Sequence, residues 1–124
     1  MSQASVRVTV PPAAGFVRIV RVVASASAAK AGLDINKLDD LALAIDEACG
    51  ALLEVAGTTS LECTVDLVAH GIEVLLVGHN AEQPSWPPAG WLDSLAGIVL
   101  EGITSRVEPY THDGAPAIRF AIAA

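Results

Sequence analysis

The sequence has 124 residues, of which 52% are hydrophobic and 17% are charged. This balance excludes intrinsic disorder and predicts one packed domain spanning residues 1–124. The formal net charge of −7 argues against non-specific binding to nucleic acid or to an anionic membrane. Because no uncharged apolar run reaches the length of a membrane span and no signal pattern opens the chain, we expect a cytoplasmic protein.

The N-terminal part of the sequence predicts a strand followed by a helix. Alternating residues from Val6 to Val10 indicate a short strand, which ends at Pro11-Pro12. Residues 14–31 form an apolar segment of helical length. Its polar side chains fall on one stripe, formed by Arg18, Arg21 and Ser25.

A second helix is predicted from its N-cap, Asp34, to about Ala56. Its apolar residues recur every three or four positions and therefore share one face: Leu38, Leu41, Ile45, Cys49, Leu52 and Ala56. Glu47 and position 51 are four residues apart, so they are neighbours on another side of the same helix.

The rest of the chain predicts two hairpins with a loop and a short helix between them. The expected strands span 60–69, 72–79, 106–112 and 117–123, with turns at His70-Gly71 and Asp113-Gly114. Residues 80–90 are rich in proline and predict an irregular loop, and residues 91–102 predict a third helix with Asp93 or Ser94 near its start. Antiparallel hairpins together with amphipathic helices predict a two-layer α/β sandwich.

One helix resembles a known nucleotide-binding element. Residues 41–51 read Leu-Ala-Leu-Ala-Ile-Asp-Glu-Ala-Cys-Gly-Ala, which resembles the N-box of the anti-sigma-factor serine kinases, in the GHKL (histidine-kinase-like) ATPase superfamily. The resemblance implies that Glu47 matches the general base of phosphoryl transfer and that Ala51 replaces an asparagine that binds magnesium. Glu47 is then a vestigial catalytic residue. The resemblance also implies three helices on one face of a mixed, mostly antiparallel sheet.

The other nucleotide-binding motifs of that family are altered in this sequence. Gly78 stands where the adenine-binding aspartate would be, and Asn80 replaces the glycine that follows it. Ser94 and Ala96 occupy the glycine positions of the turn that would face the phosphates, with Gly97 adjacent. Each lost polar contact costs roughly 1–3 kcal/mol, enough together to turn micromolar affinity into millimolar or weaker. We therefore expect no cofactor, and ATP with magnesium only if the chain is an active kinase.

Four residues are candidates for contact with a partner protein. In the family that the sequence resembles, an arginine on the first helix contacts partners, which points to Arg18 or Arg21; the alternative is a solvated stripe. Trp86 and Trp91 flank a pair of prolines in the segment that forms the lid over ATP in the active kinases. These indoles either pack the loop against the sheet, where it would occlude an empty pocket, or serve as aromatic anchors for a partner.

No metal site is expected. Cys49 and Cys63 have neither a metal-ligand nor a disulfide spacing, so we expect both in the core. His79, His112 and Asp113 have no paired ligand spacing either, and we expect them at turns and strand ends.

The resemblance, together with the altered nucleotide-binding motifs, implies a bacterial regulator that acts by stoichiometric protein binding. The resemblance implies a sigma factor or a STAS-type anti-anti-sigma protein as the partner, with a homodimer as a further option, and no direct contact with nucleic acid or membrane. Two alternatives remain open. One is an active serine kinase in which Glu47 is the base and ATP the phosphate donor. The other is a small-molecule sensor that reuses the emptied nucleotide pocket.

Overall fold

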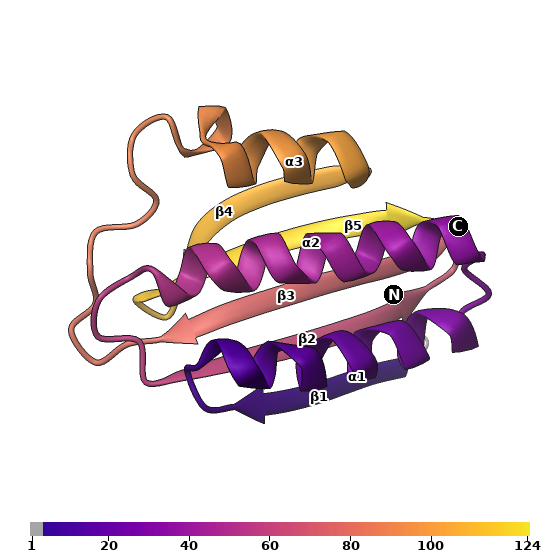
Figure 1. Ribbon diagram of the computed structural model, residues 1–124, viewed down its shortest axis with the longest axis horizontal. Helices are drawn as coiled ribbons and strands as arrows, with labels where there is room; N and C mark the ends of the chain where they lie inside the picture. Colours follow the sequence, from indigo (N-terminus) through magenta and orange to yellow (C-terminus); the bar gives the residue numbers. More distant parts are fainter. Residues whose placement is uncertain (1–3) are drawn as a thin grey trace.

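The computed structural model describes residues 4–124, which form a five-stranded sheet with three α-helices on one of its faces (Figure 1). The strands are β1 (Ala4–Val10), β2 (Ser60–Val68), β3 (Gly71–His79), β4 (Arg106–His112) and β5 (Ala115–Ala123). The helices are α1 (Val17–Lys30), α2 (Ile35–Leu53) and α3 (Leu95–Ile103), with 3₁₀ turns at Ala14–Phe16 and Trp91–Asp93. The predicted α/β sandwich is confirmed.

The sheet has the strand order β1-β2-β3-β5-β4, and every neighbouring pair in it is antiparallel. The mixed sheet implied by the resemblance is therefore wrong for this chain. β3 and β4 do run in the same direction, but β5 lies between them and pairs with both. No parallel pair forms within residues 4–124, because the final hairpin inserts its second strand next to β3.

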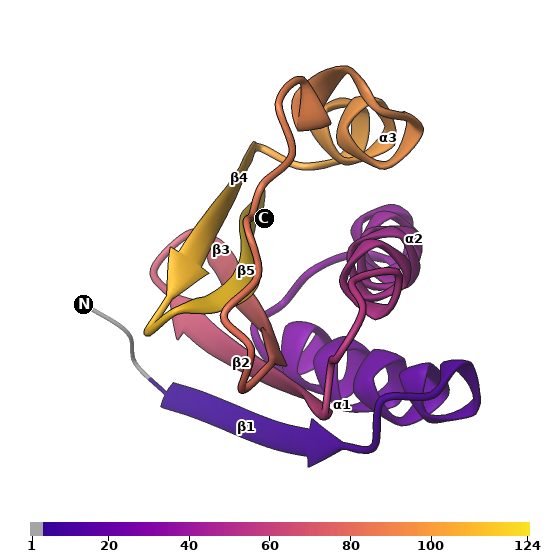
Figure 2. The same ribbon diagram turned by 90° about the vertical axis from the view of Figure 1, so that its left-hand side faces the viewer.

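All three helices lie on the same side of the sheet, as Figure 2 shows. α1 packs over β1 and β2, α2 over β3 and β5, and α3 against β4. Burial alternates along β2 with the period of a strand that has one face in the core. Leu61, Cys63 and Val65 point toward the helices and are fully buried, whereas Glu62 and Thr64 lie on the face that the helices leave uncovered.

Cys49 and Cys63 are free, buried cysteines, in agreement with the prediction that both belong to the core. Burial raises the pKa of each thiol to about 12, because the interior does not solvate a thiolate. Both side chains therefore remain neutral at physiological pH and act as small apolar residues.

Side-chain hydrogen bonds fix both ends of α2. The Asp34 carboxylate accepts a hydrogen bond from the backbone N–H of Lys37 at 3.0 Å, which confirms the predicted N-cap. At the other end the Thr58 hydroxyl lies 3.1 Å from the carbonyl oxygen of Leu52 and 2.8 Å from that of Val55. α2 accordingly ends at Leu53 and does not reach the predicted Ala56.

Of the two hairpin turns, the one between β4 and β5 lies where predicted, and the one between β2 and β3 does not. β4 and β5 join at Asp113-Gly114 as expected, and both residues have positive φ (50° and 83°), as a two-residue hairpin turn favours. β2 and β3 join at Ala69-His70, one residue earlier than predicted, because Gly71 already belongs to β3. A Cβ on Gly71 would collide with the carbonyl oxygen of Ile122, so the close approach of β5 requires glycine there.

The third predicted helix, 91–102, is divided in two. Ser94 has an extended backbone (φ −72°, ψ 164°), which separates the 3₁₀ turn at Trp91–Asp93 from α3. Its hydroxyl oxygen accepts a hydrogen bond from the backbone N–H of Gly97 at 3.2 Å and so caps α3. A Cβ on Gly97 would lie 2.5 Å from the carbonyl oxygen of Trp91, so the 3₁₀ turn folds back directly onto this glycine.

No helix within residues 4–124 is long and apolar enough to cross a membrane.

The contact at Gly97 predicts opposite effects for two Gly→Ala changes in α3. Gly97→Ala should lower the free energy of unfolding by about 1–3 kcal/mol, because the new methyl group meets backbone atoms that cannot move away. Gly102→Ala meets nothing within 4 Å and should raise the same quantity by up to about 1 kcal/mol. Urea denaturation of both variants tests this, and equal stabilisation by the two changes would contradict the packing described.

Candidate functional site

A cavity of about 580 Å³ lies between α2 and the segment that leads into α3. Its size is ordinary for a small-molecule site. One wall comes from α2 and the residues just after it: Asp46, Glu47, Gly50, Ala51, Glu54 and Val55. The opposite wall consists of Ser85, Trp86, Pro88, Ala89, Gly90, Trp91, Ser94, Leu95 and Ala96. The fold thus brings together the N-box-like helix, both tryptophans and the start of α3.

The α2 wall presents two carboxylates without a counter-charge. Glu47 and Glu54 are seven residues apart, about two helical turns, and therefore lie on the same side of the helix. Neither forms an ion pair within 4.0 Å in the part of the chain that the structure describes. Ala51 lies between them and offers only a methyl group. This wall therefore has no side-chain oxygen at the position that the resemblance assigns to magnesium.

The two indoles hold the opposite wall in place. The Trp86 Nε1–H donates a hydrogen bond to the carbonyl oxygen of Ala117 in β5 at 3.1 Å, and the ring centroids of Trp86 and Trp91 are 5.9 Å apart. Trp91 is only 7% exposed and Trp86 is half-buried. Both side chains therefore pack the loop against the sheet, and Trp91 has little surface left to serve as an anchor for a partner. The loop lines the cavity and does not fill it.

Gly78 and Asn80, which stand at two positions of the altered nucleotide-binding motifs, have packing and hydrogen-bonding roles in the fold. Gly78 does not line the cavity; it is buried in β3, where a Cβ would contact Leu52 at 3.4 Å. Asn80 is also buried, and its amide donates to the carbonyl oxygen of Ala56 at 2.9 Å while its side-chain oxygen accepts from the backbone N–H of Glu82 at 3.0 Å. Asn80 thus ties the loop to the end of α2. Asparagine directly after a strand often forms a turn through its side chain, so the position of Asn80 after β3 is the sequence signal for this structural role.

The cavity wall is strongly acidic. It contains the carboxylates of Asp46, Glu47 and Glu54, of which only Asp46 has an ion-pair partner within residues 4–124, and no described lysine, arginine or histidine lines it. A triphosphate would carry its own negative charges into this field, and no cationic side chain among the described residues of the wall would offset the repulsion. The site therefore disfavours nucleotides for a reason additional to the missing motifs.

Arg21, one of the two candidate arginines, forms an ion pair with Asp46 of the same chain. Its Nη1 lies 2.7 Å and 3.0 Å from the two carboxylate oxygens of Asp46, and this ion pair joins α1 to α2. The side chains are 35% and 43% exposed, so water screens the pair only in part. This contact could not be predicted from local sequence patterns, since the two residues are 25 positions apart.

Arg18 differs from Arg21 because its guanidinium forms no ion pair with another described residue. It is exposed, and no carboxylate within residues 4–124 lies within 4.0 Å of it. Together with Gly15 and Val17 it borders a smaller hollow of about 360 Å³ between α1 and α2. Of the two arginines, Arg18 is the one that remains available to a partner.

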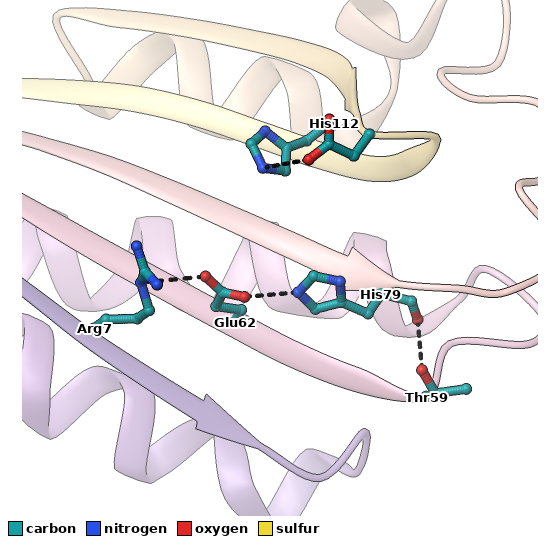
Figure 3. A network of polar contacts seen from close by, with 6 residues as sticks. Arg7, Thr59, Glu62, His79 and His112 are labelled. Carbon is teal, nitrogen blue, oxygen red and sulfur yellow. Dashed lines mark hydrogen bonds and ion pairs between the residues drawn. The ribbon is translucent and has the colours of Figure 1, made fainter.

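The uncovered face of the sheet carries a polar network but no metal centre (Figure 3). Glu62 in β2 lies 3.4 Å from the Nε of Arg7 and 2.7 Å from the Nε2 of His79. His112 lies on another part of the sheet, 3.7 Å from the carboxylate of Asp113. Among the described residues no group of three His, Cys, Asp or Glu side chains is placed to hold a metal ion.

Comparison with known proteins does not add a functional assignment. No model of a protein family matches the sequence, and a search of the curated proteins finds no significant match. The chemistry of the cavity and of the surface around Arg18 is therefore the basis for any proposal about function.

ATP should bind too weakly to matter. With carboxylates in the wall and Ala51 at the position that the resemblance assigns to a magnesium ligand, calorimetric titration with ATP and magnesium should give no dissociation constant below about 1 mM, or roughly 4 kcal/mol of binding free energy. Titration of Ala51→Asn, which restores one missing ligand, serves as a comparison. A micromolar dissociation constant for the unmodified protein would contradict this view of the site.

The ion pair between α1 and α2 predicts that the two arginines contribute differently to stability. Arg21→Ala should lower the free energy of unfolding by about 0.5–1 kcal/mol, as expected for a partly exposed, hydrogen-bonded ion pair, and high salt should shrink the loss. Arg18→Ala should change it by less than about 0.5 kcal/mol. Denaturation curves at low and high salt test this. A larger loss for Arg18→Ala would show that the pairing is assigned to the wrong residue.

Proposed function

We propose that this chain is a regulatory protein of the anti-sigma-factor type that acts by binding another protein and not by transferring phosphate. The resemblance of residues 41–51 to the N-box supports the family, and the acidic cavity with Ala51 in its wall supports the loss of nucleotide chemistry. By the same resemblance, the partner is a sigma factor or a STAS-type anti-anti-sigma protein.

The outer face of α1 is the observation that carries this proposal. Phe16, Ile19 and Val22 recur every three residues and are 39%, 46% and 59% exposed. Phe16 ends the 3₁₀ turn that leads into α1, and Ile19 and Val22 follow on α1 at intervals of three residues, so each is a neighbour of the next. Three large exposed apolar side chains next to one another are unfavourable in water unless another surface covers them. Arg18 lies on the same helix and has no ion-pair partner within residues 4–124, so the surface fits a partner with apolar side chains and a carboxylate placed to meet the guanidinium.

The Arg21–Asp46 pair supports this use of α1. It ties α1 to α2 on the inner side, so the outer face is presented on a fixed helix. A docking surface on a rigid element loses less conformational entropy on binding than a flexible segment would. Arg21 then acts as a positioning residue, and Arg18 makes the contact.

The alternative function is an active kinase. The position of Glu47 favours it, since this carboxylate lines the cavity. In that case Glu47 would accept the proton of the serine hydroxyl during phosphoryl transfer. Incubation with radiolabelled ATP, magnesium and STAS-type proteins from the same genome separates the two functions. The binding role predicts no transfer, whereas transfer that is lost in Glu47→Ala would establish the kinase.

The binding role is tested with purified sigma factors and STAS-type proteins from the same genome. Val22→Asp should weaken capture of the partner at least tenfold, about 1.4 kcal/mol, because it buries a carboxylate in an apolar interface. Ile98→Asp on α3 is a matched control, because Ile98 is 58% exposed and receives the same charge; its effect should stay within twofold. Arg18→Ala should also weaken capture. Equal effects of Val22→Asp and Ile98→Asp would contradict the assignment to α1.

A further inference from the structure

The cavity beside α2 combines two unlike walls, and this contrast indicates what it binds. One wall carries the carboxylates of Glu47 and Glu54, about two helical turns apart, while the other is mostly apolar and includes the only two tryptophans of the chain. A cavity of about 580 Å³ is large enough for a small organic molecule. This site is separate from the outer face of α1, so the inference goes beyond the proposed protein-binding role.

The charges of the wall exclude anionic ligands and favour a cation. Asp46 already has a counter-charge in Arg21, but Glu47 and Glu54 have none among the described residues. Two carboxylates without an ion-pair partner at the edge of an apolar cavity each gain from a positive group placed beside them. No cationic side chain lines the cavity, so this group has to come from a ligand.

The spacing of the two carboxylates argues against a metal ion. Seven residues of α-helix correspond to a rise of about 10 Å, whereas the oxygen ligands of a single calcium or magnesium ion lie within about 2–2.6 Å of it. Within residues 4–124 no cluster of acidic, cysteine and histidine side chains is placed to bind a metal. An elongated ligand with two positive ends suits the spacing better than one ion does.

The opposite wall suits the body of such a ligand. Trp86 and Trp91 both line the cavity, with Trp86 the more exposed of the two, and Pro88 and Leu95 add aliphatic surface. Methylene groups lose water favourably against this wall, and an ammonium group near an indole face gains a cation–π attraction of about 0.5–2 kcal/mol. The hydrogen bond from Trp86 to Ala117 holds that indole in place before any ligand arrives.

We propose that the cavity between α2 and α3 binds a linear diamine or polyamine, with its ammonium groups at Glu47 and Glu54 and its methylene chain against Trp86 and Trp91. The indoles form one wall and the carboxylates the other, so both parts of the ligand are recognised at once. Ligand binding leaves the outer face of α1 free.

The probe is spermidine, with the dicarboxylate suberate as an anionic comparison. Spermidine should change the tryptophan fluorescence saturably and suberate should not. Glu47→Gln combined with Glu54→Gln removes both charges while keeping shape, and should weaken spermidine binding at least tenfold. Asp39→Asn combined with Glu101→Gln is the matched control: both residues are exposed, lie outside the cavity wall and change the net charge by the same amount. This control should change the affinity by less than twofold.

Three results would overturn the proposal. Equal weakening by the two double variants would mean that spermidine is a diffuse counter-ion of an acidic protein. Absence of saturable binding, or binding only of a lysine-containing partner segment, would mean that the cavity is not a site for a free amine. Val22→Asp should leave spermidine binding unchanged, so failure of the protein-binding role and failure of the amine site can be told apart.

Discussion

α2 lies over β3 and β5 and buries one face against them, and this packing holds the helix in a single rotation about its axis. The fully buried side chains of that face are Leu41, Ala44, Ile45, Ala48, Cys49 and Leu52. Each large one contributes about 1.5–3 kcal/mol when removed from water, so rotating the helix would be costly. This packing fixes the direction of the other side chains: Asp46 contacts Arg21 of α1, and Glu47, Ala51 and Glu54 line the cavity.

α2 thus presents different side chains to its two neighbours, α1 and α3. Toward α1 the helix offers Asp46, which neutralises Arg21 and leaves the apolar outer face and Arg18 for a partner. Toward α3 it presents Glu47 and Glu54, which have no ion-pair partner in the part of the chain that the structure describes, across from the tryptophans. The proposed docking surface and the proposed amine site therefore lie on opposite sides of α2, and each can be altered by substitution without removing the other.

Local signals in the sequence predicted most of the fold, whereas contacts between distant residues were not predictable. The Asp34 N-cap and the Asp113-Gly114 turn depend on neighbouring residues and were predicted correctly. The Arg21–Asp46 pair depends on how two helices pack, which periodicity does not specify. The same applies to the acidic cavity: the seven-residue spacing of Glu47 and Glu54 was visible, but the absence of any cation from the opposite wall became apparent only from the structure.

The acidity of the cavity is the central claim, and charged fluorescence quenchers measure it directly. Both tryptophans of the chain line the cavity, so no other indole contributes to the signal. Caesium should quench their fluorescence more efficiently than iodide, relative to a free tryptophan derivative, because the carboxylates attract cations. Removal of the charges at Glu47 and Glu54 should reduce this difference more than the same net change at Asp39 and Glu101 does. Equal quenching by the two ions, or an equal response of the two double variants, would contradict the account.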